Sequence, residues 1–190
     1  MLASITPLGQ RGRRSHWGIT VSAFLVGATA AGAGAGALLG ALGGVVLPAH
    51  GTPAVLAAAI AVAVVLDGLP RGVPGPRRQV DERWLDRYRG WVYGAGYGAQ
   101  LGLGVTTIVS SAATYVALLA AFLTASTGSG ALILGCYGAV RGLTPLAAAG
   151  VRSQRQLIDF HRALARWRGP ARWGALAAQA GMLVLALALS

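Results

Sequence analysis

Residues 91–124 have the sequence WVYGAGYGAQLGLGVTTIVSSAATYVALLAAFLT, which contains no charged side chain. One straight helix of this length would measure about 50 Å, whereas the hydrocarbon layer of a bilayer is roughly 30 Å thick. The segment must therefore tilt steeply or be interrupted, and we predict an interruption. Gly94, Gly98 and Gly102 recur at every fourth residue, which gives the first half a smooth side where another helix can approach closely.

The second half of this segment carries hydroxyl side chains that would share one helical face, namely Thr107, Ser110, Ser111 and Thr114. Polar groups inside a bilayer need partners within the protein, because lipid tails offer none. We therefore predict that this face looks into the helix bundle or into a small water-filled cavity.

The composition is that of a membrane protein. Of 190 residues, 55% are hydrophobic, 11% are charged and 29 are glycine, which leaves too little polar surface for a soluble domain. A net charge of +11 could indicate nucleic-acid binding, but all sixteen basic residues are arginines and fifteen of them lie in three clusters, at 11–14, 71–89 and 152–172. Apolar runs separate the clusters. This is the positive-inside pattern, so we expect the lipid bilayer as partner and no nucleic acid.

The arginine clusters also predict a topology. We expect an all-α, polytopic helix bundle in a bacterial inner membrane, with the N-terminus in the cytoplasm and five crossings. The crossings are residues 18–47, 53–69, 91–124, 130–150 and 173–190. They belong to a single integral membrane domain, 1–190, with a basic leader (1–16), a first helical half (17–69), a basic cytoplasmic linker (70–90) and a second half (91–190). Amphipathic patterns at 80–90 and 152–172 predict two helices on the inner membrane surface.

The first crossing contains a glycine strip of its own, formed by Gly32, Gly36, Gly40 and Gly44. Four-residue spacing is typical of tight helix packing. The same composition would also suit a weak, glycine-rich break beside a site. The two interpretations do not exclude each other.

Two charged residues lie at the end of an apolar run or within one. Asp67 ends the second crossing, directly before Gly68 and Pro70, which favours an interfacial carboxylate over a buried functional one. Arg141 lies near the middle of an apolar run, where a guanidinium costs at least ~2.5 kcal/mol. It either reaches toward the cytoplasm or has a partner in the fold. Pro145 should bend the helix beside it.

Three consecutive blocks of the second half carry a family resemblance: GYGAQLGLGVTTIVSSAATY, GALILGCYGAVRGLTPLAAA and RALARWRGPARWGALAAQAGMLVLAL. Together they resemble the cytochrome c biogenesis membrane proteins CcdA and the membrane domain of DsbD, which carry thiol electrons across the bilayer. The resemblance covers residues 91–190, and the first half adds only FLVGATAAGAGAGALLG. It implies two broken helices that meet at mid-depth, an architecture that is used in transport.

The chain departs from this family where the family's chemistry resides. The family's reactive cysteine falls at Ile108, its flanking prolines fall at Thr107 and Ser111, and the first half has no cysteine. Disulfide exchange requires an attacking thiolate and a partner sulfur. With Cys136 alone we expect no thiol–disulfide enzyme, and electron transfer through this single thiol is kept only as a third hypothesis. The resemblance therefore implies a shortened relative, with five crossings where six are typical.

The first hypothesis is a transporter for a small solute. An anion is favoured, because hydroxyl groups and a guanidinium would bind it through charge-assisted hydrogen bonds. The pathway would be lined by Thr106, Thr107, Ser110, Ser111, Thr114 and Arg141. Packing or breaks beside it would involve Gly32, Gly36, Gly40, Gly44, Gly94, Gly98, Gly102, Gly104 and Pro145.

The second hypothesis is a non-catalytic accessory or assembly subunit for redox maturation. Its glycine strips would bind the helices of a partner subunit or of a second copy of the chain. We expect no cofactor and no metal for either hypothesis, since the sequence contains no phosphate loop, no HExxH motif and no paired carboxylates inside the membrane.

Overall fold

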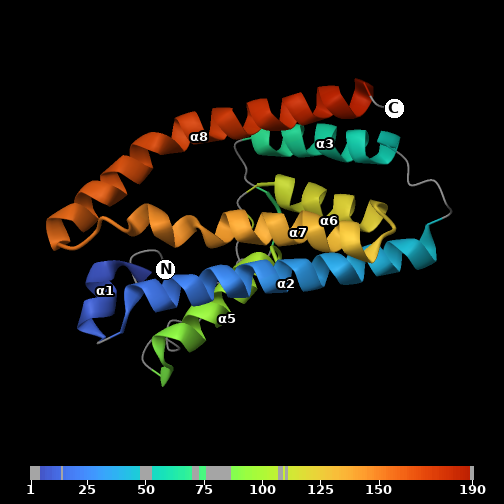
Figure 1. Cartoon of the computed structure of the whole chain (residues 1–190). Helices are drawn as coiled ribbons and strands as arrows, with labels where there is room; N and C mark the ends of the chain where they lie inside the picture. Colours follow the sequence, from blue (N-terminus) through green and yellow to red (C-terminus); the bar gives the residue numbers. More distant parts are fainter. Residues whose placement is uncertain are drawn as a thin grey trace.

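The computed structural model describes residues 5–13, 15–47, 53–69, 73–75, 87–106, 109 and 111–188. Within these ranges the chain forms helices and no strands, which confirms the predicted all-α class. In order, the elements are α1 (Pro7–Gly12), α2 (Trp17–Val46), α3 (Pro53–Gly68), α5 (Gly90–Gly102), α6 (Ala113–Leu123), α7 (Thr127–Gly142), the 3-10 helix η2 (Thr144–Ala148) and α8 (Gln154–Ala188). In Figure 1, α2 and α7 run side by side, and α3 lies along the second half of α8.

Three helices of the described chain are long and apolar enough to cross a membrane: Trp17–Val46, Thr127–Ala148 and Gln154–Ala188. Two further apolar helices, α3 and α6, are shorter. The five predicted crossings thus correspond to three full-length candidates, one short helix and one interrupted segment. Length and hydropathy would thus allow three of the described helices to cross a membrane.

The interruption predicted within residues 91–124 is confirmed. α5 ends at Gly102 and α6 begins at Ala113, and we call the described residues between them, 103–106, 109, 111 and 112, the break. Gly104 has φ +79°, a backbone conformation that side chains with a Cβ rarely adopt. A Cβ at this position would also lie 3.1 Å from Thr114 Cγ2. A glycine therefore allows the chain to leave α5 and turn toward the start of α6.

The glycine strip of α5 packs against α2. If Gly94, Gly98 and Gly102 each carried a Cβ, these atoms would lie 2.5, 2.0 and 2.1 Å from backbone carbonyl oxygens of α2. The oxygens belong to Thr20, Phe24 and Ala28. Such distances are impossible for real atoms, so only glycine permits this approach. The predicted packing role of this strip is confirmed.

The glycine strip of α2 packs in the same way against α7, and the alternative of a break in the first crossing is wrong, because α2 is continuous. A Cβ at Gly36 would lie 2.0 Å from the Gly130 carbonyl oxygen, and one at Gly40 would lie 2.2 Å from that of Ser126. At the end of the strip Gly43 replaces Gly44: its Cβ would lie 1.9 Å from a carbonyl oxygen, whereas Gly44 is exposed. A four-residue spacing drifts around a helix of 3.6 residues per turn, which explains the shift.

Because the chain's own helices occupy both strips, residues 32–44 do not offer a smooth surface to a second copy of the chain. A dimer sealed through them would require α7 to move away from α2. The two strips are thus not free for a partner in this arrangement, and the accessory-subunit hypothesis stays an untested prediction.

The predicted basic leader is part of the fold. Ile5, Thr6 and Gln10 are each 1% exposed, and α1 packs against the start of α2. Gln10 Oε1 accepts hydrogen bonds from the Tyr93 hydroxyl at 2.6 Å and from the Thr20 hydroxyl at 3.2 Å. This network ties α1 to both α2 and α5.

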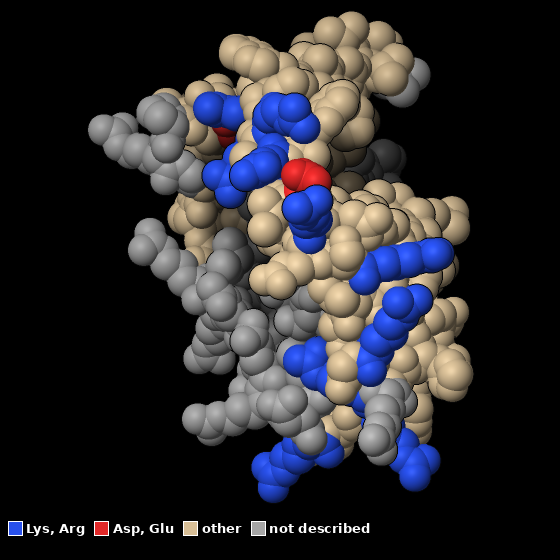
Figure 2. Space-filling view, turned by 90° about the vertical axis from the view of Figure 1, so that its left-hand side faces the viewer, with Lys and Arg blue, Asp and Glu red and all other residues tan. Residues whose placement is uncertain are grey.

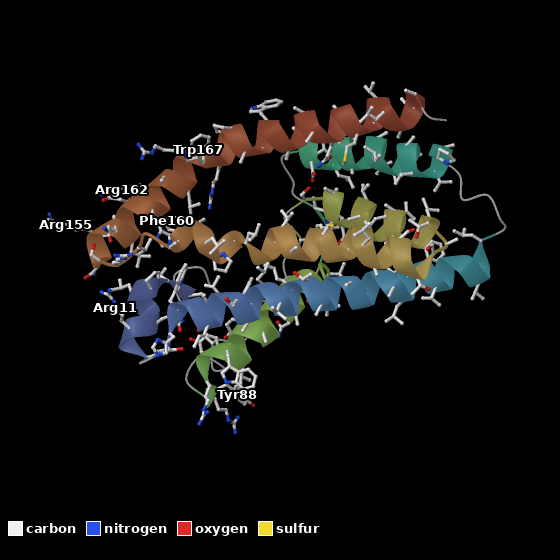
Figure 3. The ribbon with its side chains drawn as sticks, viewed as in Figure 1. Arg11, Tyr88, Arg155, Phe160, Arg162 and Trp167 are labelled. Carbon is white, nitrogen blue, oxygen red and sulfur yellow. The ribbon has the colours of Figure 1, made fainter. Side chains whose placement is uncertain are left out.

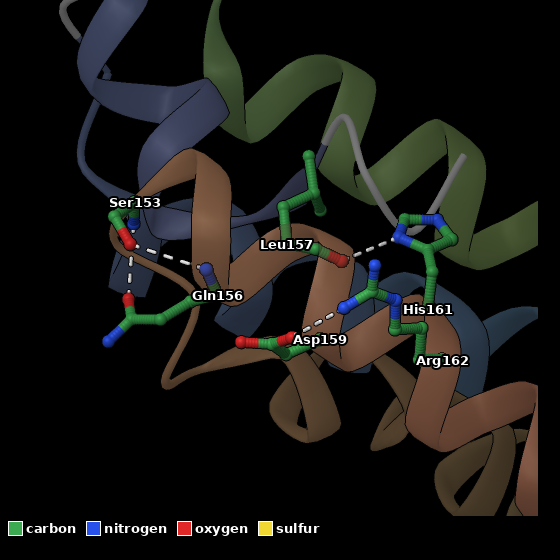
Figure 4. Close-up of polar contacts among 6 residues, drawn as sticks. All are labelled: Ser153, Gln156, Leu157, Asp159, His161 and Arg162. Atoms are coloured by element: carbon green, nitrogen blue, oxygen red, sulfur yellow. Dashed lines mark hydrogen bonds and ion pairs between the residues drawn. The ribbon is translucent and has the colours of Figure 1, made fainter.

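The prediction that residues 152–172 and the last crossing are separate helices is wrong, because α8 is one helix from Gln154 to Ala188, whereas a position of its first half on the membrane surface stays a prediction. A capping box begins it: Ser153 Oγ accepts from the Gln156 N–H at 3.3 Å, and Gln156 Oε1 accepts from the Ser153 N–H at 3.1 Å (Figure 4). Pro170 lies inside the helix, which bends partway along its length in Figure 1. The other predicted surface helix, at 80–90, lies mostly outside the described residues.

The described arginine groups gather at one end of the molecule. Figure 3 places Arg11, Arg155 and Arg162 there, from α1 and the first half of α8, and Tyr88, just before α5, at the lower edge of the molecule. Figure 2 looks at this end and shows Lys and Arg side chains spread across it. We call it the arginine end. The opposite end carries the last residues of α2 and the turn from α6 to α7 (Figure 1).

Candidate functional site

α5 and α7 both approach the same backbone oxygen of α2, and this places the break beside α7. A Cβ at Gly102, the last residue of α5, would lie 2.1 Å from the Ala28 carbonyl oxygen. One at Gly138 of α7 would lie 2.3 Å from the same oxygen, and Ala28 is fully buried. The break therefore begins next to the part of α7 that carries Tyr137 and Arg141.

Arg141 belongs to a small polar cluster at this point, the Arg141 cluster, formed with Tyr137 and Thr114. Arg141 Nη1 donates to the Tyr137 hydroxyl at 2.5 Å, and the guanidinium carbon lies 5.4 Å from the centre of the tyrosine ring. The Tyr137 hydroxyl is 2.8 Å from Thr114 Oγ1 on α6. A cation on α7 is thus connected, through two hydroxyl groups, to the first turn of the helix that follows the break.

The guanidinium of Arg141 points away from the arginine end. Tyr137 lies one turn nearer to the start of α7, which is at the opposite end of the molecule (Figure 1). The alternative with a partner in the fold is therefore confirmed, and the alternative in which Arg141 reaches toward the cytoplasm stays a prediction, because the orientation of the chain is itself only predicted. A Cβ at Gly142 would lie 3.1 Å from Leu25 Cα, and Leu25 follows Trp17 by eight residues, or about 12 Å of helix. The half-buried Arg141 is thus well inside the bundle.

Arg141 has no acidic partner among the residues that the structure describes, since its contacts there are with Tyr137. A guanidinium carries five N–H groups, and this one uses a single nitrogen for a neutral oxygen. The charge of the cation is therefore not balanced within the described chain. Such a group attracts an anion that can reach it.

Pro145 does not bend α7 but ends it. The helix stops at Gly142, and the chain continues as η2 with Pro145 in its first turn. Proline lacks the N–H that would bond to the carbonyl oxygen of Arg141. The Thr144 hydroxyl donates to this oxygen instead, so the last turn keeps its hydrogen bond without a regular helix.

A second polar cluster, the Asp67 cluster, consists of Asp67, Ser111 and Gln179. Asp67 Oδ2 accepts from the Ser111 hydroxyl at 2.7 Å and from Gln179 Nε2 at 2.6 Å. Asp67 Oδ1 accepts from the backbone N–H of Ala112 at 2.8 Å, directly before α6. A carboxylate at a helix start is stabilised by the free N–H groups and the positive end of the helix dipole.

The interpretation of Asp67 as an interfacial residue stays a prediction, but its carboxylate is not left to water alone. Its carboxylate binds donors on the break and on α8, at the point where α3, α6 and α8 meet. Arg172 completes this junction: its guanidinium donates to the carbonyl oxygens of Asp67 and Gly68, at 3.1 and 2.8 Å. These are orphan carbonyls at the end of α3, where a cation is favourable.

No family model, curated protein or solved structure matches this chain. A functional interpretation therefore depends on the two clusters and the break that separates them.

The predicted pathway residues are divided between these clusters. Ser111 binds Asp67 and Thr114 binds Tyr137, so the two do not form the single hydroxyl face that was predicted. Thr106 is exposed at the break, and its hydroxyl donates to the Gln100 carbonyl oxygen. Thr107 and Ser110 lie outside the described residues.

Two polar residues of the clusters were missed in the sequence. Tyr137 precedes Arg141 by four residues, a spacing that brings side chains together on a helix. Gln179 is an isolated polar residue in the apolar second half of α8, and such residues mark a partner inside the bundle. Both signals were present in the sequence.

Few described side chains could support thiol chemistry or metal binding. Cys136 is a free, exposed thiol. The described part of the chain contains no group of three or more His, Cys, Asp or Glu side chains that could hold a metal ion.

Proposed function

We propose that this chain is a membrane transport protein for a small anion, and that the anion passes the break beside Arg141. One observation carries the proposal: a guanidinium well inside the bundle points away from the arginine end and has only a neutral partner among the described residues. A buried cation without a counter-ion is costly. An anion that enters the break relieves this cost, and the N–H groups of the guanidinium supply its hydrogen bonds.

The break supports the proposal independently. In many carriers, interrupted helices expose backbone groups to a solute at mid-depth, and two helix ends provide partial charges there. Here α5 ends and α6 begins beside Tyr137, and the Asp67 carboxylate accepts from the backbone N–H of Ala112, directly before α6. This leaves Arg141 as the cation available to the solute. The resemblance of residues 91–190 to the CcdA and DsbD family implies two broken helices, of which this chain has only the one within residues 91–124, since α2 is continuous.

The orientation is part of the proposal. The arginine end lies in the cytoplasm of a bacterium and the rest of the chain in its inner membrane. An anion from the cytoplasm then meets the clustered arginines before it reaches Arg141. An anion from the other side first meets the opposite end, which lacks this cluster.

The test measures anion flux into liposomes that contain the purified chain, using chloride, nitrate and formate. Arg141→Ala should lower the flux at least tenfold, because a charge-assisted hydrogen bond contributes about 1.5–3 kcal/mol and 1.4 kcal/mol corresponds to a factor of ten. Arg141→Lys keeps the charge and should retain part of the flux. Arg166→Ala, an exposed arginine of α8, is the matched control and should leave the flux unchanged. Equal flux for the native chain, Arg141→Ala and empty liposomes would refute the proposal.

A further inference from the structure

A groove lies between α3, α6 and α8 and opens to the outside of the helix bundle. It encloses about 380 Å³ and is lined by apolar side chains with one exception, Gln179. Met182 and Leu185, on its α8 wall, are 47% and 63% exposed. The lining extends over 179–186 on α8 and over 113–120 on α6, about 10 Å along each helix. The groove is therefore elongated along the helices, which suits an extended hydrocarbon chain.

The second half of α8 follows a level that is rich in arginine and tryptophan. Arg168 and Arg172 precede the groove, and Trp167 and Trp173 beside them are 67% and 72% exposed. These residue types are typical of the level of lipid headgroups. Arg172 precedes Met182 by ten residues, or about 15 Å of helix. One leaflet has half of the roughly 30 Å of the hydrocarbon layer, which is the same length. A lipid whose phosphate lies beside the arginines thus has the end of an acyl chain at the groove.

The two arginines lie on the same side of α8 as the groove. Steps of three or four residues, which keep to one side of a helix, connect them to its lining through residues 168, 172, 175, 179, 182 and 186. The contacts of Arg172 agree with this side, because its guanidinium reaches the end of α3. α3 supplies Leu56 and Ile60 to the groove. A headgroup at the arginines and a chain in the groove can therefore belong to one molecule.

The charge of these arginines is not balanced within the described chain. Arg168 is exposed and forms no hydrogen bond or ion pair with another described residue. Arg172 uses Nε and Nη2 for carbonyl oxygens at the end of α3, and its Nη1 has no partner among the described residues. The nearby Asp67 carboxylate accepts from neutral donors on the break and on α8 instead. Two guanidinium groups thus offer charge-assisted hydrogen bonds to a phosphate.

We propose that the groove binds one acyl chain of an anionic phospholipid, whose phosphate is held by Arg168 and Arg172. This site requires the membrane location of the proposed function and is independent of the anion pathway. Within the described chain, α8 contacts the rest of the bundle chiefly through α3. A chain in the groove touches α3, α6 and α8 at once, so the bound lipid connects α8 to α6.

The experiment uses the full chain in phosphatidylcholine vesicles that contain a trace of a photoreactive phospholipid. One probe is an anionic phosphatidylglycerol with a diazirine at the end of an acyl chain. The matched probe is a phosphatidylcholine with the same chains and no net charge. After illumination, mass spectrometry locates the labelled residues. We expect the anionic probe to label the groove lining at least about fivefold more than the matched probe, the effect of one basic side chain on an anionic headgroup. Unlabelled phosphatidylglycerol should compete.

Two pairs of variants test the chain and the headgroup separately. Ala117→Phe fills the groove and should lower labelling at Met182 at least about tenfold, since displacing two methylene groups is sufficient for this loss. Ala177→Phe is its control, because position 177 is exposed on the opposite side of α8. Arg168→Gln should lower labelling by the anionic probe about fivefold and leave the matched probe unchanged. Arg155→Gln, at the far end of α8 (Figure 3), should change neither.

Equal labelling of the groove by both probes would overturn the inference, because ordinary surrounding lipid behaves in this way. Unchanged labelling of a folded Ala117→Phe protein would do the same. Labelling of the exposed side of α2 without labelling of the groove would overturn it by showing that a protein, such as a second copy of the chain, covers the groove. The comparison of the two probes needs no variant, so the test survives a folding defect in Ala117→Phe.

The same experiment separates this site from the proposed function. The absence of labelling from every helix would contradict the membrane location and the transport function together with the lipid site. Labelling of other exposed helices without preference for the groove would contradict the lipid site alone.

Discussion

Replacing Gly36 by alanine tests how closely α2 and α7 are packed. A Cβ at Gly36 would lie 2.0 Å from the Gly130 carbonyl oxygen and 2.6 Å from its carbon. These are backbone atoms, so no side chain can turn aside to make room. Gly34 lies two residues away on the same helix, and a Cβ there meets nothing within 4 Å. Both positions are glycines of α2. They differ in the atoms that an added Cβ would meet.

The magnitude follows from these distances. The closest ordinary contacts between a helix carbon and a carbonyl oxygen are about 3.3 Å. The helices would have to separate by about 1.3 Å, the difference between 3.3 and 2.0 Å. Overpacking costs about 1–3 kcal/mol, and an obstructing backbone favours the upper half of that range. Alanine recovers about 0.5–1 kcal/mol of helix propensity. We therefore expect Gly36→Ala to lower the free energy of unfolding by about 1–2.5 kcal/mol and Gly34→Ala to raise it by up to about 1 kcal/mol.

The assay is SDS titration of the detergent-solubilised protein, with helix content followed by circular dichroism. Gly130→Ala should behave like Gly36→Ala, because its Cβ would lie 2.2 Å from the Gly36 carbonyl oxygen. The double variant should lose less free energy of unfolding than the sum of the two single variants, since one separation of α2 from α7 makes room for both methyl groups. Equal stabilities of Gly36→Ala and Gly34→Ala would refute the close approach of α2 to α7.

Two further predictions concern the polar networks and use the same titration. Asp67→Ala leaves the donors of Ser111, Ala112 and Gln179 without an acceptor, and should lower the free energy of unfolding by more than about 2 kcal/mol. Asp159→Ala removes only an exposed ion pair with Arg162 at 3.5 Å and should change it by less than about 0.5 kcal/mol; similar losses for both variants would contradict the role of Asp67. Tyr93→Phe removes a buried bond to Gln10 and should cost about 1 kcal/mol, whereas Tyr115→Phe, whose bond to Pro74 is exposed, should cost less than half of that. A Tyr93→Phe protein as stable as the native one would show that α1 is not tied to α5 in this way.

The glycine strips of α2 and α5 have the same four-residue spacing, but α2 continues through its strip and α5 ends at the last glycine of its own. Only the three-dimensional structure shows why. The strip of α2 meets the backbone of α7 along its length, so packing holds the helix together despite its glycines. The strip of α5 ends at Gly102, where Gly104 adopts a positive φ. Residues rich in Thr, Val and Ser follow, and these side chains compete with helical hydrogen bonding. The length of the apolar segment 91–124 predicted the break, but the four-residue glycine spacing could not show which of the two strips would be interrupted.

The sequence predicted several residues of the candidate site, but it did not predict which side chains contact one another. Arg141 and the hydroxyl groups were recognised because polar side chains in apolar runs are costly. The sequence could not show that Thr114 and Ser111 serve different clusters, since that depends on where the break ends. Asp67 and Gln179 are separated by more than a hundred residues, so their contact arises from the packing of α3 on α8. The continuity of α8 was missed because arginine and proline at 166–172 are typical of a loop.

The most direct test of the central claim is whether water reaches the break inside the membrane. In a Cys136→Ser background, Thr106→Cys places a thiol at the exposed break, and Val26→Cys places one on the exposed side of α2, near Ala28, where we expect lipid. Thiols react with charged methanethiosulfonate reagents as thiolates, which form only where water is present. With the protein in liposomes, we predict at least tenfold faster labelling at position 106 than at position 26. Equal, slow labelling at both positions would contradict a water-accessible break and with it the proposed pathway.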